Sequence, residues 1–148
     1  MYFVDRKKIN HTLKYMTTLM EMLETSVNSS MNEFEKLALE RIAQNIIESM
    51  IDVGNSMIDG FIMRDPGSYD DIIDILTDEK VISVEMDAPL KEVIGLRKML
   101  VRDFMSVNHK EVQTILQSNF QELRQFPASI EHYLTHELGP VSAFLPED

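Results

Sequence analysis

The stretch from residue 32 to residue 58 constrains the fold most, because its apolar residues recur with the period of an α-helix. Placed at about 100° per residue, they cover one half of a helical wheel, and polar residues cover the other half. A face this wide can pack against two neighbouring helices at once, as in the interior of a bundle. The pattern predicts one long central helix, buried through Ile42, Ala43, Ile46, Ile47, Met50, Ile51, Val53, Gly54, Met57 and Ile58.

Helix signals continue on both sides of this stretch. Apolar residues spaced alternately by three and four predict a first helix that is capped by Asp5 and ends near Thr25. After the long helix, Gly60 and the Pro66-Gly67 pair predict a loop. The apolar residues 61–63 of this loop are expected to pack against the bundle, and contact with a partner is the alternative.

Capping residues mark three later helix starts. Ser68 with Asp71, and Asn108 with Glu111, have the spacing of capping boxes, so each pair is expected to begin a helix. Asp87 is expected to cap a further helix, which contains the stretch GLRKMLVRDF.

Prolines set limits on these helices. Pro89 is expected in the first turn of its helix, where it is tolerated, whereas Pro127 is expected to kink or interrupt the last helix. Gly139-Pro140 is expected to end that helix, which leaves residues 138–148 as a C-terminal tail.

These signals predict an all-α fold, an antiparallel up-and-down bundle of four to five helices in a single domain, residues 1–148. The 44% hydrophobic content fits a globular chain with its own core. The chain has no cysteine, which excludes disulfides, thiolate zinc sites and cysteine nucleophiles. It shows neither a signal sequence nor an apolar run long enough to cross a membrane, so a cytoplasmic protein is expected.

The net charge of −11 argues against broad binding to a polyanion such as RNA. Residues 52–87 hold ten acidic and two basic side chains, a local charge of −8, so any RNA-binding surface has to be local and lie elsewhere. The acidic segment is expected to be a solvated face. A cation site formed by Asp71, Asp74 and Asp78 is the alternative, but the spacing and glycine of a calcium loop are missing. We expect no cofactor and no metal.

Arg97 occupies the middle of an apolar stripe that runs from Leu90 to Phe104. A lone guanidinium in an apolar interior would cost several kcal/mol of desolvation, roughly, so Arg97 needs a partner or a cleft. Glu48 and Asp52, on the polar half of the long helix, are candidate partners in a structural ion pair. The alternative is an anion site in which Arg97 offers its donors to a phosphate.

Arg102 follows five residues later, about 140° around a helix from Arg97. On one straight helix the two side chains diverge. They converge only if the helix ends or bends between them, or if two chains pair and each contributes. The alternative for Arg102 is a solvated surface residue.

Three stretches of the chain point to a known family: LERIAQNIIESMIDVGNSMIDGFI, the loop RDPGSYDDIIDIL, and GLRKMLVRDF before NHKEV. Through these stretches the sequence resembles the HepT-like helical proteins of the HEPN superfamily. The resemblance runs from about residue 5 to residue 144, is most specific over residues 51–76, and is closest to a stand-alone Firmicute-type subgroup.

The resemblance implies an up-and-down bundle that forms a homodimer through the helices that carry the family motif. In active family members that motif is Arg, a polar residue that is often Asn, a short spacer, then His, any residue and Tyr. Two copies meet across the dimer and cut RNA without a metal. The Arg binds phosphate, and the His acts as acid or base for attack by the ribose 2′-hydroxyl. Many members are toxins controlled by a nucleotidyltransferase-like antitoxin, which in some cases adenylylates the motif tyrosine.

By this resemblance Arg97 matches the motif arginine, and Lys98 stands where Asn is common. Arg102 takes the place of the histidine, and Phe104, after Asp103, takes the place of the tyrosine. A guanidinium, with a pKa above about 12, cannot serve as a base at pH 7, unlike an imidazole. Phe104 has no hydroxyl to which a nucleotide could be attached.

The leading interpretation is a non-catalytic or weakly active homodimer. It would bind RNA, a nucleotide or a protein partner through Arg97, Lys98 and Arg102, and a nucleotidyltransferase-type antitoxin is a further candidate partner. The main alternative is a metal-independent ribonuclease toxin that uses Arg97 and Arg102, or Arg97 and His109. His109 is otherwise expected to be an exposed residue in a first helical turn. In a third interpretation the arginines are structural, and the loop 59–68 or the tail carries the function.

Overall fold

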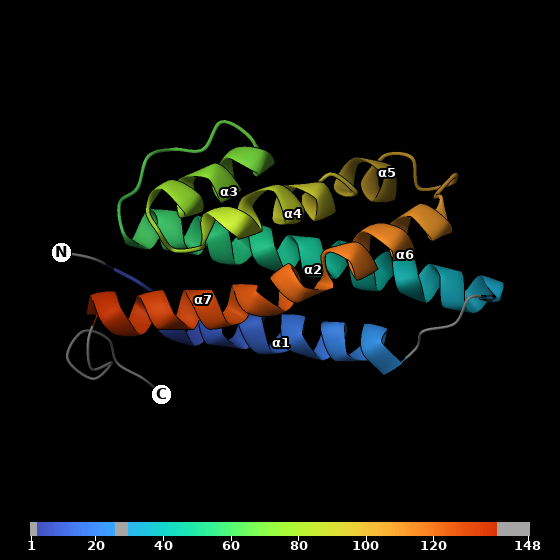
Figure 1. Ribbon diagram of the computed structural model, residues 1–148, viewed down its shortest axis with the longest axis horizontal. Coiled ribbons are helices and arrows are strands. Elements are labelled where there is room, and N and C mark those ends of the chain that lie inside the picture. Colours follow the sequence, from blue (N-terminus) through green and yellow to red (C-terminus); the bar gives the residue numbers. More distant parts are fainter. Residues whose placement is uncertain (1–2, 26–29, 139–148) are drawn as a thin grey trace.

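The computed structural model describes residues 3–25 and 30–138. This part of the chain folds into seven α-helical segments that form four roughly parallel rods (Figure 1). The first two rods are α1 and the long α2, the third is α4 with α5, and the fourth is α6 with α7, while the short α3 lies beside α2 and α4. Their bounds are α1 Arg6–Thr25, α2 Glu33–Gly60, α3 Tyr69–Asp78, α4 Val84–Ile94, α5 Arg97–Val101, α6 His109–Ser118 and α7 Phe120–Leu138.

The all-α, up-and-down architecture is therefore confirmed, but four to five helices was too low a count for the described part. The third rod breaks at residues 95 and 96, between α4 and α5, and the fourth breaks at Asn119. The Asn119 side chain is buried and donates hydrogen bonds to Glu92 Oε1 on α4 and to the Ile115 carbonyl on α6. These two bonds stabilise the break between α6 and α7.

The predicted caps at three helix starts are present, but Ser68 with Asp71 and Asn108 with Glu111, expected as capping boxes, show only the bond to the cap side chain in the described residues. Asp5 accepts a hydrogen bond from the Lys8 amide, Ser68 accepts one from the Asp71 amide, and Asn108 accepts one from the Glu111 amide. Each satisfies a backbone donor that the first turn of a helix leaves unpaired. A full capping box that the sequence analysis did not identify starts α2, where Asn32 and Glu35 exchange side-chain-to-backbone bonds.

The core lies around α2, whose predicted apolar face is almost completely buried. Gly54 marks the closest approach of another helix. A Cβ atom at this position would lie 2.4 Å from Cγ2 of Ile72 on α3, a distance that no real contact allows. Glycine at position 54 is therefore what lets α3 pack directly on α2.

The expected start of α4 was wrong. Ser83 is the N-cap, and Asp87 lies one turn inside the helix, where it accepts a hydrogen bond from the Thr77 hydroxyl and pairs with Lys91 at 2.9 Å. Val81 and Ile82 are buried just before this start, so packing fixes the turn earlier than the capping signal suggested. Pro89 lies past the first turn, where it lacks the N–H that would bond to the carbonyl of Glu85.

The expected interruption at Pro127 was also wrong, because α7 runs through it as one helix. The helix is described up to Leu138. The predicted stop at Gly139-Pro140 and the tail lie outside the described residues.

The loop after α2 doubles back along the bundle, and α3 then lies at the edge of the bundle beside α2 and α4 (Figure 1). Phe61 is buried and packs edge-on against Tyr133, with ring centroids 5.1 Å apart. Ile62 is exposed and has a φ of 56°, a left-handed conformation in which the chain reverses. The loop is thus packed through Phe61 but not through Ile62. Within residues 3–25 and 30–138, none of the helices combines the length and apolar character that crossing a bilayer requires.

Candidate functional site

Arg97, the first residue of α5, pairs with Glu48 near the middle of α2. Its Nε and Nη2 donate to the same carboxylate oxygen, Glu48 Oε1, at 3.1 and 3.0 Å. Asp52, the other candidate, lies 3.7 Å from Lys8 instead. Arg97 is partly buried, with 27% of its side chain exposed, so the pair meets the need for charge compensation that its position in the apolar stripe creates.

Tyr69 covers a face of the same guanidinium. The central guanidinium carbon of Arg97 lies 4.5 Å from the centroid of the Tyr69 ring, within the range of a cation–π contact. Among the described residues no group accepts a hydrogen bond from Nη1 of Arg97. Arg97 is therefore held on one edge by Glu48 and stacked on a ring, while its Nη1 donors remain available.

The other motif residues lie at the end of α5. Arg102 follows the last residue of the helix and is exposed, as are Lys98, Asp103 and Phe104. Within residues 3–25 and 30–138, Arg102 has neither an ion pair nor a side-chain hydrogen bond. The amides of Arg102 and Asp103 still bond back to the Lys98 carbonyl, so the helical path continues past α5. Within one chain, Arg97 and Arg102 therefore leave different sides of this path.

His109, at the start of α6, is not the exposed residue that was expected. Its Nε2 lies 2.6 Å from Oε2 of Glu40 on α2, and 21% of its side chain is exposed. Glu40 and Glu48 are two helical turns apart, about 12 Å along α2. The His109 and Arg97 pairs thus lie on the same side of α2, but one phosphate group does not span both within one chain.

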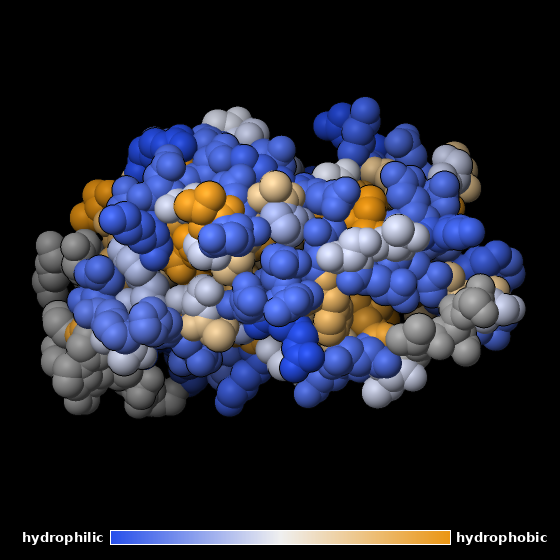
Figure 2. All heavy atoms as spheres, in the orientation of Figure 1, coloured by the Kyte–Doolittle hydropathy of each residue, from blue (hydrophilic) through white to orange (hydrophobic). Residues whose placement is uncertain are grey.

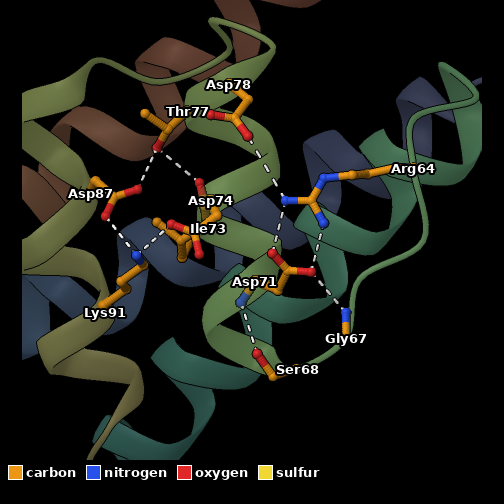
Figure 3. Close-up of polar contacts among 10 residues, drawn as sticks. All are labelled: Arg64, Gly67, Ser68, Asp71, Ile73, Asp74, Thr77, Asp78, Asp87 and Lys91. Atoms are coloured by element: carbon orange, nitrogen blue, oxygen red, sulfur yellow. Dashed lines mark hydrogen bonds and ion pairs between the residues drawn. The ribbon is translucent and has the colours of Figure 1, made fainter.

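Asp71 holds the loop that leads to Tyr69 (Figure 3). Its two carboxylate oxygens accept from Nη1 and Nη2 of Arg64 at 2.8 and 2.9 Å, and one of them also accepts from the Gly67 amide at 2.8 Å. The hydrogen bonds from Arg64 and Gly67 lower the pKa of Asp71 to about 2. This bidentate clamp fixes residues 64–71 and, with them, the position of Tyr69.

The other acidic side chains of this region are also paired. Lys91 bonds to Asp74 and to Asp87, and Arg64 lies 3.8 Å from Asp78 (Figure 3). The hydrogen bonds that Lys91 donates to the carboxylates of Asp74 and Asp87 raise the pKa of Lys91. In the described part of the chain, no group of three or more His, Asp or Glu side chains is arranged to hold a metal ion. The alternative of a cation site at Asp71, Asp74 and Asp78 is thereby wrong, because Arg64 and Lys91 occupy the carboxylates.

The low pKa of Asp71 predicts an acid-dependent contribution to stability. A carboxylate whose pKa is about 2 when folded, against an ordinary value of 3.8, stabilises the fold above pH 4 and loses this effect between pH 4 and pH 2. Urea denaturation of the wild type and Asp71→Asn is expected to show a difference in midpoint that is largest at pH 7 and nearly gone at pH 2. A difference in urea midpoint that stays constant with pH would show that the lowered pKa of Asp71 does not stabilise the fold.

A cavity of about 620 Å³ lies away from these residues, between the end of α1, the start of α2 and α6. Figure 2 shows apolar side chains gathered in the hollow between α1 and α6. The cavity shares no residue with the Arg97 site. Its lining includes Leu23, Met31, Leu39, Ile42, Leu116 and Phe120.

A family model described as Ribonuclease HepT-like matches residues 9–130. The chain belongs to the HepT-like ribonuclease family. Over 144 residues it is 46% identical to YutE of Bacillus subtilis (strain 168), a protein that carries a provisional name as an RNase. The match covers 97% of this chain and 99% of YutE. The solved structure of YutE, described as a cytosolic protein of unknown function, has a TM-score of 0.91 to this HepT-like chain and covers 97% of it and 100% of the YutE chain.

Two toxin–antitoxin structures share the HepT-like fold at lower identity. The tri-AMPylated HEPN toxin of Shewanella oneidensis, in complex with an MNT antitoxin, is 21% identical, with a TM-score of 0.70 over 84% of this chain and 95% of that chain. A mutant form of the toxin–antitoxin pair MntA-HpeT is 19% identical, with a TM-score of 0.74 over 84% and 98%. At these identities the likeness supports the fold alone. The resemblance inferred from the helical pattern and the arginine motif is thus confirmed by the family match and by YutE.

Proposed function

We propose that this HepT-like protein is a homodimer that binds single-stranded RNA at an arginine-lined seam and does not cleave it. The observation that carries the proposal is the state of the two arginines. Arg97 is fixed by Glu48 and Tyr69 yet keeps Nη1 available, and the exposed Arg102 stands where active relatives carry the motif histidine. Both are permanent cations, suited to holding phosphates and unable to move a proton at pH 7.

Exposed apolar side chains beside the arginines support a seam between two copies. Phe104 and Met105, which follow Arg102 closely in the chain, are 60% and 89% exposed at the end of α5, and Val101, directly before Arg102, is 37% exposed. A cluster of such residues usually marks an interaction surface. Pairing two chains here would cover these residues and bring both copies of Arg97 and Arg102 to one groove.

Phe104 also limits what a nucleotidyltransferase-type partner could do. The Shewanella oneidensis toxin is AMPylated and bound to an MNT antitoxin. In this chain the ring of Phe104 offers no oxygen to accept a nucleotide. A partner of that type could bind this surface but could not modify position 104.

Labelled single-stranded RNA, incubated with purified protein and chelator, tests the proposal. We expect retention of the RNA by the protein and recovery of intact RNA. For Arg102→Ala, the logarithm of the RNA-binding constant is expected to fall less steeply with the logarithm of the salt concentration. The slope becomes shallower by about 0.7 for each phosphate that the protein no longer neutralises. No retention of RNA, or an unchanged salt slope for Arg102→Ala, would contradict the proposal.

One observation favours a second candidate, a metal-independent ribonuclease. His109 is held 2.6 Å from Glu40, and a carboxylate-paired imidazole is a common general base. In this case the wild type would cut RNA in the presence of chelator, and His109→Gln would not. If the wild type leaves RNA intact, the second candidate is excluded.

A further inference from the structure

Tyr69 places an aromatic ring at the anion site without belonging to the arginine motif. It is the first residue of α3 and lies far from Arg97 in sequence. One face of its ring lies against the Arg97 guanidinium, 4.5 Å from the ring centroid. The residue is nevertheless 45% exposed, so its exposed surface belongs to the parts of the side chain that Arg97 does not cover.

Tyr69 belongs to the acidic segment 52–87, whose charge argues against binding a phosphate there, so its exposed surface fits a neutral group better than a phosphate. Asp70, the next residue, is exposed and has no cationic partner among the described residues. Its carboxylate repels phosphate at this end of the site, whereas the Nη1 donors of Arg97 attract it. A nucleobase is uncharged and stacks on aromatic rings, and the phosphate of the same nucleotide carries the negative charge. An aromatic ring next to a free arginine edge matches both parts of one nucleotide.

The ring is also held in place before any ligand binds. Asp71 fixes the preceding loop through Arg64 and the Gly67 amide, and Ser68 caps α3 at the Asp71 amide (Figure 3). Tyr69 lies between the cap and the clamp. A surface ordered in this way loses little conformational entropy when a base stacks on it.

We propose that Tyr69 is a stacking platform for one nucleobase of the bound RNA, with an adjacent phosphate held by Arg97. The inference rests on the proposed RNA binding and adds the residue that contacts a base. Stacking is tolerant of sequence, because every base has a π face. The site therefore selects single-stranded over double-stranded RNA rather than one sequence over another.

A double-mutant cycle between protein and probe tests this inference. The probes are a labelled single-stranded oligoribonucleotide and an abasic sugar–phosphate chain of the same length. The proteins are the wild type, Tyr69→Ala, Tyr69→Phe and, as a matched control, Tyr15→Ala. Tyr15 is a second half-exposed tyrosine, on α1, with its hydroxyl bonded to Asn45. Circular dichroism establishes that each variant is folded.

We expect Tyr69→Ala to bind the intact RNA roughly 5- to 100-fold more weakly and to bind the abasic chain as the wild type does. Tyr69→Phe and Tyr15→Ala are expected to keep wild-type affinity for both probes, since stacking does not need the hydroxyl. Equal weakening on both probes would mean that Tyr69 only positions Arg97, and it would overturn the inference, as would no weakening at all. Failure of the wild type to bind either probe refutes the proposed function itself, and is seen before any variant is compared.

Discussion

Replacing Arg97 with alanine is expected to weaken the binding of single-stranded RNA by about 50-fold or more, as measured by fluorescence anisotropy. Arg97 presents the Nη1 donors that remain after Glu48 has taken Nε and Nη2. Charge-assisted hydrogen bonds to phosphate are among the strongest that a side chain forms, and the proposed dimer holds two copies of this residue.

The matched control for this prediction is Glu48→Gln, which breaks the same ion pair from the other side. If the ion pair is only structural, both variants lower the free energy of unfolding, and neither has a specific effect on the affinity for RNA. If Arg97 binds phosphate, Glu48→Gln keeps RNA binding or tightens it, because the amide competes less strongly for the guanidinium. Wild-type RNA affinity in a folded Arg97→Ala protein would exclude Arg97 from the site.

The second large effect is expected at Gly54, the point of closest approach between α2 and α3. Gly54→Val is expected to lower the free energy of unfolding by about 2–3 kcal/mol. The new Cβ alone would lie 2.4 Å from Cγ2 of Ile72, and that methyl group sits on a β-branched side chain with little freedom to turn away. Urea denaturation measures the effect directly.

Asn55→Val provides the control for Gly54→Val. Asn55 is the next residue of α2 and is exposed, and asparagine and valine have similar helix propensities. Its substitution is expected to change stability by less than about 0.5 kcal/mol. A similar loss in both variants would show that α2 tolerates valine poorly at either position, and that the contact with Ile72 is not the cause.

The sequence predicted those parts of the fold that depend on neighbouring residues. The amphipathic face of α2 and the caps at Asp5, Ser68 and Asn108 are local patterns, and each was found as expected. The start of α4 was not predicted, because Asp87 resembles a cap but is used by Thr77 and Lys91. The break at Asn119 was missed for a similar reason, since its partner Glu92 lies on another rod.

The candidate site was predicted only in part, because most of its contacts join distant segments. The need of Arg97 for a partner or a cleft followed from its place in an apolar stripe, but Glu48 and Asp52 lie one turn apart on α2, and only the position of α5 distinguishes them as partners. Tyr69 was missed because its position depends on the path of the loop that doubles back after α2. The Glu40–His109 pair joins residues of α2 and α6 and leaves no local signal.

Restoring the motif histidine tests whether Arg102 keeps this protein from cleaving RNA. Wild type and Arg102→His, each at equal concentration with chelator, are incubated with labelled single-stranded RNA, and the products are resolved by length. We expect the wild type to bind the RNA and leave it intact, and Arg102→His, which regains a group able to transfer protons near pH 7, to cleave it. Chelator-resistant cleavage by the wild type that disappears in Arg97→Ala would show that the protein is a ribonuclease and not a non-catalytic RNA-binding protein.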